Sequence, residues 1–174
     1  AESAQRTLIV NSRLARQPVP DRGGDIDWAA ELREFAQLNY PGYYLQPFQS
    51  VPGGWLSQGA ATINRQAMEA IYTETHPQSS LGMRAHFAER VPADAKVVVD
   101  MGAGNGDGAA AVARRLPHAR VIALEASPFM TIVGRRENRD CPNLEWLHAL
   151  AEESTLDNDS VDCVMIQFVL HECP

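Results

Sequence analysis

The stretch Val97-Val98-Val99-Asp100-Met101-Gly102-Ala103-Gly104-Asn105-Gly106-Asp107-Gly108 decides the fold. A short apolar run ends in a carboxylate, and alternating glycines follow before the alanine-rich segment from Ala109 to Leu116. This order predicts a buried strand, a tight turn and a helix. The glycines keep the backbone open to a ligand and tolerate positive φ angles. The N–H groups at the start of the helix would face whatever binds on the loop.

Two ligand classes use such a loop. Gly104, Gly106 and Ala109 have the G-x-G-x-x-G/A spacing of a dinucleotide site, as in an NAD-binding Rossmann enzyme. Asp100, Gly102, Gly104 and Gly106 instead have the D-x-G-x-G-x-G spacing of loops that bind S-adenosylmethionine. Asp100 favours the second class, because a carboxylate at the strand tip repels a pyrophosphate and attracts an ammonium group. An ordinary turn with glycines for tight packing is the third interpretation.

Residues 100–108, Glu125 at the end of the next strand, and residues 157–164 with Leu170-His171 together resemble a class I S-adenosylmethionine-dependent methyltransferase. The resemblance covers roughly Lys96 to Pro174. It implies a Rossmann-like α/β fold with about four parallel strands in this chain, preceded by a helical N-terminal cap. It also implies S-adenosylmethionine as cofactor and methyl transfer to a small-molecule or protein acceptor.

Glu125 ends the second expected strand, 120–125, about 20 residues after the glycines, where a carboxylate can accept both hydroxyls of a ribose. Charged hydrogen bonds contribute roughly 1.5–3 kcal/mol each, so Glu125→Ala is expected to weaken cofactor binding about tenfold or more. The alternative is a solvated acidic loop residue.

The resemblance implies further cofactor contacts at the ends of the later strands. After the third expected strand, 144–148, the family commonly has an Asp that binds the adenine amino group, and Leu150 stands at that position. The backbone N–H of Ala151 remains available, but the lost contact would weaken binding by about 1–3 kcal/mol. Gln167 and Phe168 end the fourth expected strand, 163–168, and would line the methionine end. The implied cofactor-binding set is Asp100, Gly102, Ala103, Gly104, Glu125, Ala126, Leu150, Ala151 and Gln167.

The sequence offers no clear catalytic set and no metal site. His171 is the one candidate general base, because the unperturbed pKa of histidine is close to neutrality, although packing is the commoner role of such a residue. His76 and His86 are ten positions apart without a third ligand in register. The three cysteines match no zinc spacing and indicate reduced thiols; they are Cys141, Cys163 and Cys173.

Composition narrows the partners. The 174 residues are 45% hydrophobic and 21% charged, and the net charge is -7 with Lys96 as the only lysine. This balance is typical of a globular protein and argues against a nucleic-acid partner. No apolar run reaches the length of a membrane span. We expect a cytoplasmic protein, or one in an organelle lumen or matrix after removal of an import sequence.

Three regions are predicted along the chain: an extended arm over 1–24, a helical cap over 25–92, and an S-adenosylmethionine-binding domain over 93–174. Within the cap, helices are expected from Asp25 or Asp27 to about Leu38, over 55–76 and over 78–91. The tyrosines of segment 39–48 either line a ligand mouth or anchor the loop to the core. In the family, such caps cover the cofactor and shape the substrate pocket.

The resemblance also implies about seven strands, of which four are expected here. The fourth would then be an apolar edge strand. A longer native chain would cover this exposed strand. A protein partner that binds this strand or the N-terminal arm is the other possibility. The alternative function is a catalytically inactive methyltransferase-like subunit with a structural role in a larger complex.

Overall fold

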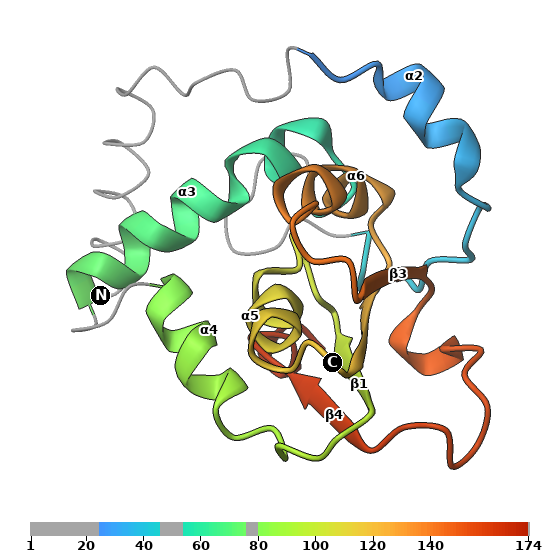
Figure 1. Ribbon diagram of the computed structural model, residues 1–174. Helices are drawn as coiled ribbons and strands as arrows, with labels where there is room; N and C mark the ends of the chain where they lie inside the picture. Colours follow the sequence, from blue (N-terminus) through green and yellow to red (C-terminus); the bar gives the residue numbers. More distant parts are fainter. Residues whose placement is uncertain (1–24, 46–53, 76–79, 174) are drawn as a thin grey trace.

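The sheet is built from four parallel strands in the order β3-β2-β1-β4 (Figure 1). The computed structural model describes residues 25–45, 54–75 and 80–173. The strands are β1 (Val97–Met101), β2 (Arg120–Glu125), β3 (Leu144–His148) and β4 (Cys163–Ile166). Apolar runs without alternation suit a sheet that is covered on both faces. The predicted Rossmann-like α/β fold is confirmed.

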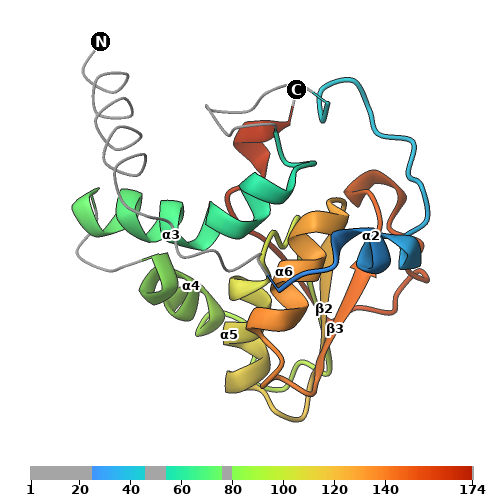
Figure 2. The same cartoon turned by 90° about the horizontal axis from the view of Figure 1, so that it is seen from above.

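Helices connect the strands on one side of the sheet (Figure 2). Helix α5 (Asp107–Arg115) joins β1 to β2, and helix α6 (Pro128–Glu137) joins β2 to β3. Ser127 caps α6, as predicted, because its hydroxyl accepts the N–H of Met130 at 3.3 Å and Pro128 fills the first turn. These right-handed crossovers bring the carboxyl ends of the strands to one edge.

Two apolar layers enclose the sheet. Val98, Val121 and Met165 face α5, together with the alanines of that helix. Val99 and Ile122 point to the opposite face, where coil residues such as Leu156 and Val161 cover them. The small alanines let α5 approach the strands closely, so the glycine loop before it lies directly above the ends of β1 and β2.

The helices before the sheet are shorter than predicted. Helix α2 (Trp28–Glu31) and the 3-10 turn η1 (Leu32–Glu34) replace the helix expected to reach Leu38, although Asp27 does cap α2. Helix α3 (Gln58–Thr75) begins after Ser57, whose hydroxyl accepts the N–H of Ala60 at 3.1 Å. An N-cap serine therefore sets a start that the apolar spacing had placed at Trp55.

Helix α4 (Ser80–Ala88) ends earlier than the expected Val91. Arg115 explains the stop, because its guanidinium donates to the carbonyls of Ala88 and Val91 at 3.0 and 2.9 Å. Strand β4 also ends early, at Ile166, since the chain turns at Phe168 with a φ of 58°. Two further 3-10 turns follow β3 and β4: η2 (Ala151–Glu153) and η3 (Leu170–Glu172).

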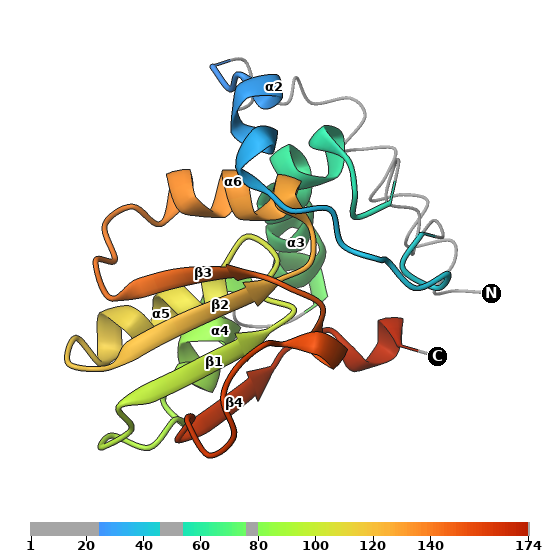
Figure 3. The ribbon, with the colours of Figure 1, turned by 90° about the vertical axis from the view of Figure 1, so that its right-hand side faces the viewer.

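The segment after η1 returns to the sheet. In Figure 3 the cyan chain that follows α2 passes the carboxyl ends of the strands, at the right of the view. The predicted N-terminal arm, residues 1–24, lies outside the described residues. Among the helices described, none combines the length and the apolar character that crossing a membrane requires.

Candidate functional site

Three glycines of the loop between β1 and α5 have positive φ: Gly102 at 70°, Gly104 at 56° and Gly106 at 73°. A Cβ on Gly102 would lie 2.5 Å from Cγ2 of Val169, and one on Gly106 would lie 2.5 Å from the Trp146 ring. A Cβ on Gly104 would meet nothing closer than 3.9 Å. The expectation that the glycines keep the backbone open to a ligand therefore fits Gly104 alone, because protein atoms fill the space at the other two.

Trp146 explains two of the glycines. Its ring lies under Gly106 of the loop and against Gly134 of α6, where a side chain at either position would collide with it. Residue 146 is 40 positions after the loop in the chain, so sequence reasoning missed this contact. The one available signal was a glycine inside a predicted helix, which often marks close packing.

Glu125 ends β2 and is only 6% exposed. The N–H of Gly104 donates to its Oε2 at 2.7 Å, and the N–H of Ser127 donates to its Oε1 at 2.7 Å. Burial raises the pKa of Glu125 above its usual value, while these two donors oppose the rise. The alternative of a solvated loop residue is excluded.

Asp100 in β1 is 1% exposed, and its Oδ2 has no hydrogen-bond partner in the described structure. Burial raises the pKa of Asp100 to about 7, against the opposing charge of Arg84 on α4 and the N–H of Ala109. Gln167, which is 8% exposed, lies on the same face, and its Oε1 also lacks a partner. Both side chains pack against Gly108. A Cβ at this position would lie 2.7 Å from Gln167 Nε2 and 2.8 Å from Asp100 Oδ2.

Helix α3 is tied to the glycine loop by polar contacts. Asn105 Nδ2 donates to the carbonyl of Ala61 at 3.2 Å. The Arg65 guanidinium forms a two-pronged ion pair with Asp107, at the first turn of α5. Helix α3 therefore holds the glycine loop and the first turn of α5 in place.

The remaining predicted contacts are spread along the sheet edge. Ala103 is buried and donates its N–H to the Leu124 carbonyl at 3.0 Å. The Ala126 carbonyl accepts the Tyr40 hydroxyl at 2.8 Å and lies 2.9 Å from His148 Nε2.

Leu150 is 7% exposed and is the N-cap residue of η2. Its aliphatic side chain has no hydrogen-bond acceptor. Ala151 is exposed. His171 in η3 is also exposed, and its Nε2 lies 3.0 Å from Glu172 Oε1.

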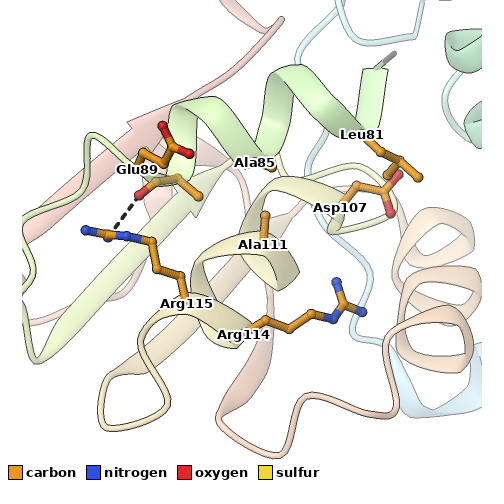
Figure 4. Close-up of a pocket in the computed structure, with 8 residues that line it drawn as sticks. Leu81, Ala85, Glu89, Asp107, Ala111, Arg114 and Arg115 are labelled. Carbon is orange, nitrogen blue, oxygen red and sulfur yellow. Dashed lines mark hydrogen bonds between the residues drawn. The ribbon is translucent and has the colours of Figure 1, made fainter. Parts of the chain in front are cut away.

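A separate pocket of about 480 Å³ lies between α4 and α5 (Figure 4). Leu81, Ala85 and Ala111 form its apolar part, with Glu89 and Arg114 at the margin. None of the predicted cofactor contacts lines it. No cluster of three or more His, Cys, Asp or Glu side chains suited to a metal occurs within the described residues.

Comparison with known proteins shows what this region is similar to. Residues 98–174 match the family model described as "Methyltransferase domain". This region, which is less than half of the chain, is therefore similar to methyltransferase domains. A demethylmenaquinone methyltransferase from Clavibacter sepedonicus is 37% identical over 79 residues, which are 45% of this chain and 31% of that protein. The match thus spans about a third of the curated relative.

A solved methyltransferase structure shares the fold. Human N-acetylserotonin methyltransferase, solved with SAM, superposes with a TM-score of 0.52 over 82% of this chain and 39% of that one, at 16% identity. A precorrin-6y C5,15-methyltransferase from Geobacter metallireducens matches 48% of this chain and 46% of its own, at 27% identity and a TM-score of 0.43.

Proposed function

We propose that this protein binds S-adenosylmethionine at the carboxyl ends of β1, β2 and β4 and transfers its methyl group to a small-molecule or protein acceptor. The observation that carries the proposal is the pair of buried carboxylates on either side of the glycine loop. Asp100 has an orphaned oxygen, and Glu125 is held by loop and helix N–H groups. Buried acceptors without donors are rare and indicate a missing partner.

The residues present fit the cofactor. Asp100 Oδ2 and Gln167 Oε1 are unpaired acceptors that suit an ammonium group. Glu125 suits the ribose hydroxyls, and the space above Gly104 admits the ligand. Leu150 offers an apolar wall to the adenine in place of a hydrogen bond. NAD fits less well, because its negatively charged pyrophosphate would face the Asp100 carboxylate.

When bound, the cofactor supplies an electrophilic sulfonium methyl group. The chain's own residues then have three tasks: to hold the ammonium, to fix the ribose and to exclude water from the face above the loop. Such positioning can account for a large part of the rate enhancement without a dedicated acid or base. His171 is not needed in this scheme, which agrees with its exposed position beside Glu172.

Calorimetric titration of the chain with S-adenosylmethionine, S-adenosylhomocysteine and NAD tests the proposal. Both adenosyl ligands are expected to bind and NAD is not. Glu125→Ala should lower the affinity at least about tenfold. Glu145→Ala is the matched control, because it removes an exposed carboxylate in β3 that pairs with Arg120. Absence of adenosyl binding by a folded chain would overturn the proposal.

A further inference from the structure

Residues 39–45, here called the strap, cross the carboxyl edge of the sheet (Figure 3). Three phenols hold it there. The Tyr40 hydroxyl donates to the Ala126 carbonyl at 2.8 Å, and the Tyr43 hydroxyl donates to Glu152. The Tyr44 hydroxyl donates to Oε1 of Glu125 at 3.3 Å. The strap therefore touches the residue that the proposed function assigns to the ribose.

The acceptor sites of Glu125 are limited. A carboxylate has about two acceptor sites on each oxygen. One on each is taken by a backbone N–H, from Gly104 on Oε2 and from Ser127 on Oε1. Besides the N–H of Ala126, which lowers the pKa of Glu125 less than the other donors do, these bonds leave about one site per oxygen for the two hydroxyls of a ribose. Tyr44 occupies the site left on Oε1.

The strap is ordered around this contact. The rings of Tyr40 and Tyr44 stack with centroids 5.3 Å apart and planes at 22°. The hydroxyl of Tyr44 stays protonated, because burial and the nearby Glu125 raise its pKa. It is therefore a permanent donor to the carboxylate rather than a group that titrates away.

We infer that the strap gates the ribose subsite, with the Tyr44 hydroxyl competing against the ribose diol for Glu125. This inference rests on the proposed function, since it concerns the same site. Cofactor entry then requires the Tyr44 contact to break. The Tyr44 contact sets how often the site is available, because it is the strap's hydrogen bond to Glu125.

The first test compares Tyr44→Phe with the wild-type chain in titrations with S-adenosylhomocysteine. The variant keeps the stacked ring and loses only the competing hydroxyl, so it is expected to bind about three- to tenfold more tightly. Tyr43→Phe is the matched control: it removes a strap phenol that contacts Glu152 and leaves Glu125 untouched, and it should change affinity less than about twofold. Circular dichroism checks that all three chains are folded.

Unchanged or weaker binding by Tyr44→Phe would overturn the gate while leaving the proposed function standing, because the wild type would still bind in a Glu125-dependent way. If neither chain binds, both proposals fail.

A second test uses the diol itself. The gain from Tyr44→Phe is expected with adenosine and should disappear with 2′,3′-dideoxyadenosine, which lacks both competing hydroxyls. An equal gain with both nucleosides would contradict competition at the carboxylate. Both nucleosides are compared on the same variant. A general loss of stability would affect both and would not produce the expected difference.

Discussion

Asp100 and Glu125 lie at or next to the ends of neighbouring strands and are both buried, yet their surroundings differ. Glu125 accepts two backbone N–H groups and a phenol, so its charge is met by dipoles that the fold itself supplies. The charge of Arg84 and the N–H of Ala109 stabilise the ionised form of Asp100, and one of its oxygens has no hydrogen-bond partner. The donors around Glu125 thus oppose the burial that raises its pKa, whereas one oxygen of Asp100 is left for a donor that arrives with a ligand.

This contrast separates two uses of a buried carboxylate. A group whose charge is satisfied in advance recognises a neutral diol by its acceptor geometry. A group left partly unsatisfied destabilises the free protein and gains most when a cation binds. The ligand-free chain should therefore gain stability when Asp100 is replaced by a neutral residue.

The largest predicted effect is on stability at Asp100. Its pKa in the folded chain is about 7 against a usual value of 3.8. Because the folded pKa is raised, the favourable contribution is present below about pH 4 and is lost as the pH rises through 7. Asp100→Asn should thus stabilise the chain at about pH 8 by up to about 4 kcal/mol, and much less near pH 4. Urea unfolding of both chains at the two pH values measures this.

Asp162 provides the control of opposite sign. Its Oδ2 accepts the N–H groups of Val97 and Lys96, and these hydrogen bonds lower its pKa. Asp162→Asn should therefore destabilise the chain near neutral pH, and this loss of stability should shrink as the pH falls. A difference between Asp100→Asn and wild type that does not change with pH would contradict the assignment of a raised pKa to Asp100.

The second prediction concerns the loop that separates the two carboxylates. Gly106→Ala must adopt positive φ and push aside the Trp146 ring, so we expect a loss of roughly 2–4 kcal/mol in the free energy of unfolding. Gly104→Ala faces open space and should lose only about 1–2 kcal/mol, from backbone strain. Its main effect should be weaker adenosyl binding, measured by titration. Equal losses of stability would refute the distinction between a packing glycine and a ligand glycine.

The sequence predicted the parts of this site that depend on local order. The bounds of β2 and β3, the acidic tip at Glu125 and the Ser127 cap follow from apolar runs and capping residues within a few positions. The early end of the first helix was not predictable in this way. Phe35 leaves the helix to pack edge-on against His148, 5.0 Å away between ring centroids, and this partner lies far away in the sequence.

Contacts between distant residues were also missed. Trp146 under Gly106 and the Tyr44 hydroxyl on Glu125 join residues 40 and 81 positions apart. No periodicity reports such pairs, because they depend on how the whole sheet and its N-terminal helices pack. The tyrosines of the strap were noticed as a cluster, but only the fold distinguishes the one that faces the carboxylate.

The third prediction uses pH to separate the carboxylates in binding. An ammonium favours the ionised form of Asp100, so adenosyl affinity should rise about tenfold between about pH 6 and about pH 8. Asp100→Asn should bind more weakly and lose most of this dependence. Titrations in matched buffers measure both, and a pH dependence that survives the substitution would assign the effect to Glu125.

The smallest predicted effect is at Glu145, whose charge is stabilised mainly by water. Its carboxylate forms a two-pronged ion pair with Arg120, and both side chains are more than half exposed. The Arg120 hydrogen bonds lower the pKa of Glu145, yet water screens the pair. Glu145→Gln should therefore change the free energy of unfolding by less than about 1 kcal/mol, and less still in high salt. A change in unfolding free energy as large as that of Asp100→Asn would contradict the contrast between buried and solvated carboxylates. Solvent exposure would then not determine how much each carboxylate affects stability.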